Sequence, residues 1–259
     1  MADTPPPLAG RVAVVTGGAG GIGSAVCRRL ANAGSAVVVG FRRDEAAARS
    51  LAASLPGREH AACQADVTDR GSLGRFADEI GARYGRVDLL VNSVGTTRFV
   101  PHADLSALDD DLIDEIFRTN WRGPFATIRS LKPLLEKAAL AQGPAGSALV
   151  VNISSLAGVT GMGSNVAYCA SKAALNAMTI SLARALAPAV RVVSVSPGLV
   201  ETGFIKGLDE SWRKEQITRT ALGRLASPDD VADAVLAVAT TLRYSTGCII
   251  PVDGGRPLS

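Results

Sequence analysis

Tyr168 and Lys172 stand four residues apart at the start of a helical pattern. This spacing places a phenol and an ammonium on the same face of a helix. Two serines, Ser154 and Ser155, stand upstream, where the apolar run of residues 150–154 ends. That run is typical of a buried parallel strand, and ligands of open α/β sheets bind beyond the carboxyl ends of the strands. We therefore expect a hydroxyl, a phenol and an ammonium to meet at one small substrate.

These three types of side chain together suit the interconversion of an alcohol and a carbonyl, provided that another group moves the hydride. A free tyrosine ionises near pH ~10, and a nearby cation lowers that pKa. The phenol can then exchange a proton with a substrate oxygen that the serine hydroxyl holds by a hydrogen bond. The same spacing of tyrosine and lysine is also common on the exposed face of ordinary helices. Features elsewhere in the sequence are needed to choose between these two interpretations.

A glycine-rich segment near the amino terminus predicts a dinucleotide site. Residues 11–16 form a short apolar strand, GGAGGIG follows from Gly17 to Gly23, and a helical pattern then runs to Gly34. Strand, glycine loop and helix in this order are the context that a dinucleotide-binding motif requires. The glycines let the backbone approach a pyrophosphate closely, and the helix amino terminus contributes N–H groups and a favourable dipole.

Two arginines at the end of the next strand predict a preference for NADP(H), with NAD(H) as the other possible cofactor. Residues 35–40 form an apolar strand, and Arg42 and Arg43 follow it. An acidic residue at this point hydrogen-bonds the ribose of NAD, whereas an arginine suits the 2′-phosphate of NADP. The guanidinium matches phosphate geometry well. The alternative is a solvated pair of arginines neutralised by Asp44 and Glu45, which open the next predicted helix.

Strand and helix patterns alternate along the whole chain. Further strands are predicted at residues 60–64, 87–95, 150–154, 189–196 and 247–252, and helices at residues 44–55, 72–84, 109–137, 166–187 and 227–242. This order predicts an α/β fold, a Rossmann-type doubly wound parallel sheet of about seven strands with helices on both faces. We expect a disordered lead-in at residues 1–9, a single domain over residues 10–259, and a substrate lid at about residues 199–225.

Composition argues against several classes of function. The 259-residue chain has a net charge of +3, which is too small to indicate a nucleic-acid or membrane surface. It has no long uncharged apolar stretch, and we expect no signal peptide. The four cysteines are scattered and the histidines are His60 and His102, so we expect no metal site. Reduced thiols and a cytoplasmic location are the corresponding expectation.

The motifs along the chain together resemble the short-chain dehydrogenase/reductase family. Residues 16–23 are similar to its T-G-x-x-x-G-x-G loop, and residues 92–95 (NSVG) are similar to its N-N-A-G segment. Asp66 stands where this family contacts adenine, and the closing VDGG of residues 252–255 also matches. Four residues match the catalytic tetrad of the family: Asn120, Ser155, Tyr168 and Lys172. The resemblance extends over essentially the whole chain.

The resemblance implies hydride transfer between a nicotinamide and a substrate carbon. Tyr168 is then the acid in reduction and the base in oxidation, Ser155 orients the carbonyl oxygen, and Lys172 holds the nicotinamide ribose and lowers the pKa of Tyr168. Asn120 is expected to hold, through its main chain, a water that connects Lys172 to solvent. The implied cofactor-binding residues are Gly17, Gly21, Ile22, Gly23, Arg42, Arg43, Asp66, Val67, Asn92, Gly95, Tyr168, Lys172, Pro197, Gly198, Val200 and Thr202.

Within this family, the segments PGLVETGF, GRLASPDDVA and VDGG are most similar to 3-oxoacyl-acyl-carrier-protein reductases and related carbonyl reductases. This similarity implies a ketone reductase, with acyl carrier protein as a possible partner, that forms a homotetramer through residues 109–137 and 166–187. The alternatives are an NAD(P)-dependent alcohol or sugar dehydrogenase that works oxidatively, and a non-catalytic dinucleotide sensor. Arg98 or Lys206 could meet an acidic or phosphopantetheine group, although a solvated cation is the simpler interpretation.

Overall fold

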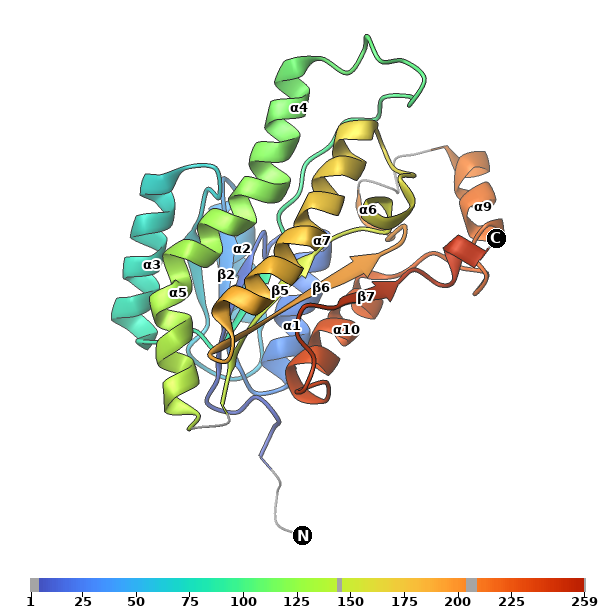
Figure 1. Cartoon of the computed structure of the whole chain (residues 1–259). Coiled ribbons are helices and arrows are strands. Elements are labelled where there is room, and N and C mark those ends of the chain that lie inside the picture. The colour runs from blue at the N-terminus through green and yellow to red at the C-terminus, as the bar shows by residue number, and fades with distance from the viewer. Residues whose placement is uncertain (1–4, 144–145, 204–208, 259) are drawn as a thin grey trace.

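The computed structural model describes residues 5–143, 146–203 and 209–258. It contains one parallel sheet of seven strands in the order β3-β2-β1-β4-β5-β6-β7 (Figure 1). The strands are β1 (Val12–Thr16), β2 (Ala36–Phe41), β3 (Ala61–Gln64), β4 (Leu89–Asn92), β5 (Ala148–Ile153), β6 (Val190–Pro197) and β7 (Ile249–Val252). The predicted Rossmann-type sheet is confirmed.

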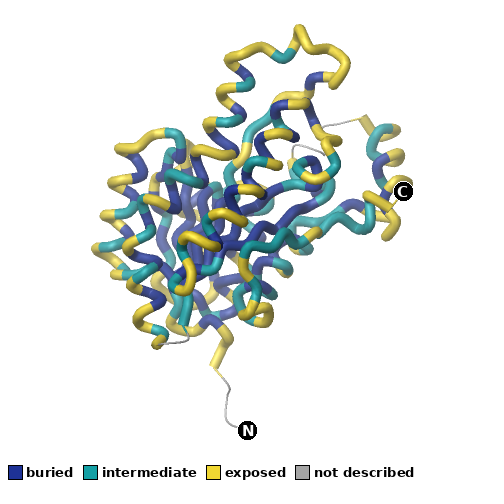
Figure 2. The backbone as a smooth tube through the Cα atoms, viewed as in Figure 1, coloured by how far each residue is buried: buried dark blue, intermediate teal, exposed yellow. Residues whose placement is uncertain are grey.

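Helices cover both faces of this sheet. The helices are α1 (Gly21–Asn32), α2 (Glu45–Ser54), α3 (Arg70–Tyr84), α4 (Asp110–Phe117), α5 (Gly123–Ala141), α6 (Ala157–Thr160), α7 (Val166–Leu186), α9 (Glu210–Thr218) and α10 (Pro228–Thr240), with a short 3₁₀ turn at Arg256–Leu258. One core contains apolar side chains of α1, α2 and α10, and the other contains those of α3, α5 and α7. Figure 2 shows the buried strands between these two layers.

The sequence of the strands explains why they lie in the middle of the molecule. Strand β1 reads VAVVT and β5 reads ALVVNI, and every residue of both strands is buried. Parallel strands covered on both faces need such continuous apolar runs. Strand β1 pairs with β2 on one side and with β4 on the other, so the order of the strands reverses there. The crevice at the carboxyl ends of β1 and β4 is the usual ligand site of such a sheet.

The helix predicted over residues 109–137 is divided in the structure. Helix α4 ends at Phe117, a π-helical turn covers Arg118–Arg122, and α5 begins at Gly123. Pro124 follows this turn and has no N–H to give to a regular α-helical ladder. The sequence pattern could not predict this π-helical turn, because helical apolar spacing is found both before it and after it. Isolated π-turns inside helices are frequent at functional sites.

The lead-in predicted as disordered is in part ordered. Leu8 is buried, and its N–H donates to the carbonyl oxygen of Ala33 at 2.9 Å. A Cβ on Gly34 would lie 2.8 Å from the Cβ of Pro6, so the lead-in packs against the turn that follows α1. The prediction is therefore wrong for residues 5–9, because a local proline count does not reveal a tertiary hydrogen bond. Residues 1–4 lie outside the described residues.

The segment predicted as a lid contains one helix in its described part, α9, while residues 204–208 lie outside the described residues. Beyond it, α10 begins at the predicted N-cap. The hydroxyl of Ser227 accepts from the N–H of Asp230, and the Asp230 carboxylate accepts from the N–H of Ser227. This reciprocal capping box fixes the start of α10, just after the segment predicted as a lid.

Neither a membrane span nor a metal cluster is found in the described part of the chain. No helix there is both long and apolar enough to cross a bilayer. The same residues contain no group of three or more His, Cys, Asp or Glu side chains that could hold a metal ion.

Replacing Asp88 with alanine is expected to destabilise the fold without changing the chemistry. Its buried carboxylate accepts from the Val12 N–H at 2.9 Å, from Arg11 Nη1 at 3.0 Å, from Arg86 Nε at 2.8 Å and from Gln142 Nε2 at 3.1 Å. Removing one partner of a buried ionic network costs about 3 kcal/mol. Urea unfolding measures this loss, and the exposed Asp78→Ala serves as the control. An unchanged unfolding midpoint for Asp88→Ala would contradict the structural role.

Candidate active site

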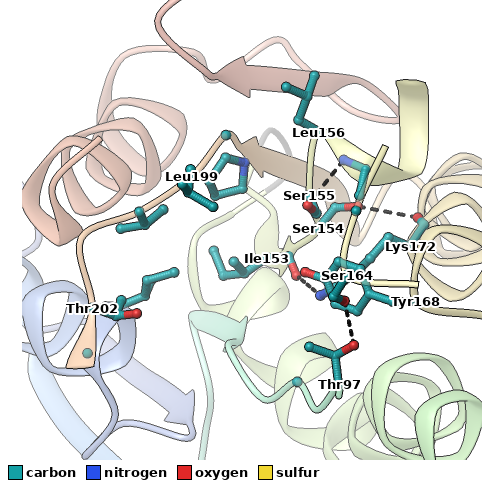
Figure 3. Close-up of a pocket in the computed structure, with 18 of the residues that line it drawn as sticks. Thr97, Ile153, Ser154, Ser155, Leu156, Ser164, Tyr168, Lys172, Leu199 and Thr202 are labelled. Atoms are coloured by element: carbon teal, nitrogen blue, oxygen red, sulfur yellow. Dashed lines mark hydrogen bonds between the residues drawn. The ribbon is translucent and has the colours of Figure 1, made fainter. Parts of the chain in front are cut away.

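A cleft of about 980 Å³ opens at the carboxyl ends of the central strands (Figure 3). Its walls come from segments far apart in the sequence: the glycine loop, the loops after β4, β5 and β6, the start of α7, helix α9 and the carboxyl-terminal turn. Ser155 lines it. The predicted cofactor-binding residues that also line it are Gly17, Gly21, Ile22, Gly23, Gly95, Tyr168, Lys172, Pro197, Gly198, Val200 and Thr202.

Asn165 positions Tyr168 at the start of α7. Asn165 is the N-cap of this helix, and its Oδ1 accepts from the N–H of Tyr168 at 2.7 Å. Its Nδ2 donates to the carbonyl oxygen of Arg98 at 2.7 Å and to Oγ1 of Thr97 at 3.2 Å. Ser164 joins the same network through a 2.5 Å hydrogen bond to Thr97, visible in Figure 3. This buried amide therefore ties the tyrosine to the loop that follows β4.

The ammonium of Lys172 lies at the carboxyl end of β5. Its Nζ donates to the carbonyl oxygen of Ile153 at 2.9 Å and lies 5.8 Å from the centre of the Tyr168 ring. Ser154 donates to the carbonyl oxygen of Lys172 at 3.3 Å, which holds α7 against the strand end. Burial disfavours the charged form and lowers the pKa of Lys172 to about 8.

The phenol of Tyr168 has a raised pKa. Burial is the main cause, and a hydrogen bond with Ser155 acts in the opposite direction, favouring ionisation. The net shift of the Tyr168 pKa is thus opposite to the expected lowering, because desolvation outweighs the contacts that favour the phenolate. The phenol of Tyr168 is therefore protonated at neutral pH.

Asn120 lies behind the cleft, fully buried in the π-helical turn. Its Oδ1 accepts from the N–H of Thr96 at 2.8 Å, and its Nδ2 donates to the Thr96 carbonyl oxygen at 3.0 Å and to Oγ of Ser171 at 3.1 Å. A Cβ on Gly95 would lie 3.6 Å from Asn120 Oδ1 and 3.7 Å from Lys172 Nζ. The amide thus joins the loop after β4 to α7 immediately beside the lysine.

The glycine loop leaves room that only glycine provides. Gly17 has φ +64°, and a Cβ there would lie 2.9 Å from the carbonyl oxygen of Ser93. A Cβ on Gly23 would lie 2.2 Å from the carbonyl oxygen of Gly17, which is impossible. The first turn of α1 therefore faces the cleft with bare backbone N–H groups, and no acidic side chain stands in that turn. These features fit the pyrophosphate of a dinucleotide.

Arg42 and Arg43 lie outside the cleft, after β2 and exposed to solvent. The N–H of Gly18 donates to the carbonyl oxygen of Gly40 at 2.9 Å, so the end of β2 adjoins the glycine loop. Burial raises the pKa of Asp66, but hydrogen bonds from Thr68 and the charges of both arginines bring it below its usual value. The two guanidiniums thus lie near Asp66, where an adenosine end is expected.

The remaining predicted cofactor residues also lie outside the cleft lining. Val67 is buried against α5, where a Cβ on Gly123 would lie 2.7 Å from its Cγ2. Asn92 is buried within β4, and its Nδ2 donates to Oδ1 of Asn152 on β5 at 2.9 Å. Its own Oδ1 has no hydrogen-bond partner among the described residues. Asn92 therefore supports the floor of the cleft.

The arginine suggested as a partner for an acidic substrate group points elsewhere. Arg98 Nη2 lies 3.1 Å from Asp109 Oδ2 and 3.0 Å from the carbonyl oxygen of Ala107. Arg98 does not line the cleft, so that suggestion is wrong. Lys206, the other candidate, lies outside the described residues.

Comparison with known proteins settles the family. Residues 17–256 match the sequence profile of a family described as enoyl-(acyl carrier protein) reductase. The chain is 39% identical to the granaticin polyketide synthase putative ketoacyl reductase 2 of Streptomyces violaceoruber, over 95% of this chain and 96% of that protein. The chain belongs to the short-chain dehydrogenase/reductase family. This dehydrogenase/reductase is an NAD(P)-dependent oxidoreductase.

Other members of the family have similar sequences and structures. A 3-oxoacyl-[acyl-carrier-protein] reductase of Thermotoga maritima is 33% identical over 96% of this chain and 98% of its own. A short-chain dehydrogenase/reductase from Burkholderia xenovorans superimposes with a TM-score of 0.87 at 34% identity, covering 96% of this chain and 98% of its own. An NADP active-site complex from Pseudomonas aeruginosa gives a TM-score of 0.88 at 32% identity, covering 98% and 99%.

The structure of this dehydrogenase/reductase reveals site residues that sequence reasoning missed. Asn165 was expected only as a residue of the pocket wall, and its role as the N-cap that positions Tyr168 was missed, although an asparagine just before a helical pattern is a recognisable N-cap signal. The others form the outer wall of the cleft: Phe99, Trp212, Glu215, Gln216, Arg219 and Arg256. The spacing of Trp212, Glu215 and Gln216 in the sequence could have shown that they share one face of a helix. It could not have shown that this face lines the cleft.

Proposed function

We propose that this enzyme reduces a ketone to a secondary alcohol with NADPH, and that Tyr168 is the general acid. The single observation that carries the proposal is the convergence of Tyr168, Ser155 and Lys172 in the cleft that the glycine loop also lines. Folding alone does not require a phenol, a hydroxyl and an ammonium to lie together in a cleft. Together with the oxidoreductase relatives, this convergence favours an enzyme over the non-catalytic sensor.

The proposed steps follow from the protonation states of the side chains. When bound, the nicotinamide supplies the hydride that reaches the carbonyl carbon. Ser155 donates a hydrogen bond that orients the carbonyl oxygen, and Tyr168 transfers its proton to that oxygen as negative charge develops. The ammonium of Lys172 stabilises the phenolate that remains. The first turn of α1 would hold the pyrophosphate, and Lys172 the nicotinamide ribose.

Asn120 has a positioning role in this proposal. Its amide is occupied by Thr96 and Ser171, so it holds the loop after β4 and helix α7 together beside Lys172. The expected water would bind to its main chain, because a π-helical turn does not form the regular α-helical hydrogen bonds. In this proposal, the side chain of Asn120 holds the two segments beside Lys172, and its main chain holds the water that connects Lys172 to solvent.

A 3-oxoacyl thioester is the substrate that the relatives favour, since several are named ketoacyl or 3-oxoacyl reductases. The experiment mixes purified enzyme with NADPH or NADH and follows cofactor loss against an acetoacetyl thioester and a panel of simple ketones. Fast, NADPH-specific reduction of the thioester supports this substrate class. Turnover of simple ketones without the thioester would indicate a specialised carbonyl reductase instead.

Oxidation of a secondary alcohol is the second candidate function. The chain is 36% identical to a cis-4-hydroxycyclohexanecarboxylate dehydrogenase of Sinomonas cyclohexanicum over 96% of its length. The same side chains serve both directions, with Tyr168 as the base. Reduction is preferred here because several relatives are named ketoacyl or 3-oxoacyl reductases. Oxidation of alcohols with NAD and no reduction of ketones would reverse this preference.

Replacing Arg42 with alanine is expected to raise the Kd for NADPH about tenfold and to leave the Kd for NADH unchanged. A guanidinium bound to a 2′-phosphate contributes about 1.5 kcal/mol or more, and NADH lacks that group. Fluorescence titration of each cofactor measures both constants. The matched control is Arg49→Ala, because Arg49 is an exposed arginine that pairs with Glu45 on α2 at 2.7 Å. Equal effects of Arg42→Ala on the two cofactors would mean that Arg42 does not bind the phosphate.

We further propose a homotetramer in the cytoplasm, with an acyl carrier protein as a partner that delivers the thioester. Exposed apolar side chains support an interface on the helices predicted for it: Trp121 stacks on Phe125 at the start of α5, and Ile180 lies exposed on α7. All four cysteines are free, which suits a reducing compartment. Light scattering of the purified protein tests the tetramer.

A further inference from the structure

A chain of polar side chains crosses the apolar core just below the cleft. Its four members are each at most 2% exposed: Asn92 on β4, Asn152 on β5, Thr179 on α7 and Ser194 on β6. Asn92 Nδ2 donates to Asn152 Oδ1 at 2.9 Å, and Asn152 Nδ2 donates to Thr179 Oγ1 at 2.9 Å. The hydroxyl oxygens of Thr179 and Ser194 lie 2.8 Å apart. The chain therefore connects three neighbouring strands to one helix.

The hydroxyl of Thr179 is the junction of this polar chain. It donates to the carbonyl oxygen of Leu175, one turn earlier in α7, at 3.0 Å. A hydroxyl has one proton to donate and two lone pairs that accept, so Thr179 must accept from both Asn152 and Ser194. All three positions of the hydroxyl are then occupied. One oxygen atom thus links α7 to both β5 and β6.

Helix α7 is attached to β5 at a second point, nearer the cleft. There Ser154 donates to the carbonyl oxygen of Lys172 at 3.3 Å (Figure 3). Asn152 and Ser154 are two residues apart, so they lie on the same face of the strand. Lys172 and Thr179 are seven residues apart, so they lie on the same side of the helix, about 10 Å apart along its axis. Two such points fix both the rotation of α7 and its position along β5.

The ammonium of Lys172 reaches β5 between these two points. Its Nζ donates to the carbonyl oxygen of Ile153 at 2.9 Å and lies 5.8 Å from the centre of the Tyr168 ring. Tyr168 and Lys172 belong to the same helix, so a displacement of α7 along β5 moves both side chains relative to the strand. A hydrogen bond weakens steeply when its distance and angle change. The place of the ammonium therefore depends on how α7 is fixed on β5.

Stability alone does not explain why the four members of this chain are polar. Their neighbours in β5, Val150, Val151 and Ile153, are buried and apolar. Replacing both partners of a buried hydrogen bond with apolar groups of the same shape is often nearly neutral for stability. Apolar contacts are non-directional, whereas a hydrogen bond requires a particular distance and angle. The polar chain thus contributes a defined position that apolar packing of the same volume does not.

We propose that Thr179 is a positioning residue, which fixes α7 on β5 and so keeps the ammonium of Lys172 at the strand end beside Tyr168. Thr179 is fully buried and does not line the cleft, so it acts through Lys172 and not on the substrate. The inference rests on the proposed function in assigning Lys172 to the chemistry at Tyr168.

The kinetic test is Thr179→Val, which keeps the shape of the side chain and removes the hydroxyl. It is expected to lower kcat for ketone reduction about tenfold, because small displacements of reacting groups have large effects on rate. Losing the hydrogen bond to Ile153 disfavours the ammonium, so the decline of kcat/KM with rising pH should move about one pH unit below that of the wild type. Thr179→Ser restores the hydroxyl and should restore both properties.

The matched control is Thr127→Val on α5. Thr127 is also fully buried, and its hydroxyl donates at 2.9 Å to the carbonyl oxygen of Gly123 in the same helix. Both valine variants are expected to lower the midpoint of urea unfolding, but only Thr179→Val should move the pH profile. An equal shift of the pH profile in both variants would show a general effect of destabilisation and would overturn the inference.

Nuclear magnetic resonance of lysine labelled with ¹³C at Cε follows the charge of Lys172 without turnover, and Lys172→Met assigns its signal. Burial lowers the pKa of Lys172 to about 8 in the wild type. The signal should titrate about one pH unit lower in Thr179→Val and as in the wild type in Thr179→Ser. An unchanged titration in Thr179→Val overturns the inference, whereas full turnover by Lys172→Met would fault only the proposed function.

Ser154→Ala provides a second variant in case Thr179→Val does not fold. It removes the other attachment of α7 to β5, at the carbonyl oxygen of Lys172. The Lys172 signal should then also titrate at a lower pH than in the wild type, because the same helix is released from the same strand. A wild-type titration in Ser154→Ala would contradict the dependence of the ammonium on the attachment of α7.

Discussion

Tyr168→Phe is expected to lower kcat for ketone reduction by a factor of about 10³ while leaving the Kd for NADPH within about twofold of the wild-type value. The substitution removes one oxygen atom and keeps the ring, which α7 and its N-cap Asn165 hold in place. The raised pKa of the phenol means that wild-type Tyr168 carries the proton to be donated at neutral pH. Without it, the oxygen of the substrate has only the hydroxyl of Ser155 as a donor.

Stopped-flow measurement of NADPH oxidation gives kcat, and fluorescence titration gives the Kd. Tyr84→Phe is the matched control, since the Tyr84 hydroxyl donates to the carbonyl oxygen of Glu59 at 2.6 Å, far along the chain from the cleft lining. Its turnover should equal that of the wild type. Full turnover by Tyr168→Phe would show that Tyr168 is not the general acid. A large increase in the Kd for NADPH would show that the substitution had disturbed the cofactor site.

Lys172→Met is expected to lower kcat/KM by a factor of about 10², because it removes the charge that stabilises the developing phenolate. In the wild type, burial lowers the pKa of Lys172 to about 8, so the ammonium is present below that pH and is lost above it. The kcat/KM for reduction should therefore fall as the pH rises through about 8. In Lys172→Met this decline should disappear. A decline at the same pH in the variant would assign it to another group.

The same substitution is expected to stabilise the fold at neutral pH. A buried lysine with a lowered pKa is less readily protonated in the folded than in the unfolded protein, so its charge costs stability below a pH of about 8. That cost decreases as the pH rises toward the ordinary lysine pKa of about 10.4. Lys172→Met should thus unfold at a higher urea concentration at neutral pH, with a gain of roughly 1–3 kcal/mol that shrinks at alkaline pH. A loss of stability would contradict a purely functional role for this lysine.

Local patterns were enough to predict the sheet and the glycine loop that follows its first strand. The apolar runs of β1 and β5, the glycines between β1 and α1, and the four-residue spacing of Tyr168 and Lys172 are each contained within a few neighbouring residues. Backbone geometry converts such local spacing directly into a strand end, a bare helix amino terminus or a shared helix face. The comparisons confirm the family that these motifs indicated.

Features that depend on distant residues could not be predicted in this way. The π-helical turn at Asn120 and the direction in which Arg98 points follow from contacts that no local pattern contains. The raised pKa of Tyr168 differs from the predicted lowering for the same reason, because desolvation depends on every segment that covers the phenol. Leu8, expected in a disordered lead-in, is ordered by a hydrogen bond to Ala33.

The sequence by itself determined the order of strands and helices, the glycine loop and the positions of the candidate acid–base residues. These depend on period, spacing and residue type, which the chain carries locally. Only the tertiary structure decided which of those residues share a cleft, how burial sets their pKa values, and that α9 and the carboxyl-terminal turn place two arginines in its wall. Long-range packing and the exclusion of water are properties of the folded chain, so they emerge only when distant segments meet.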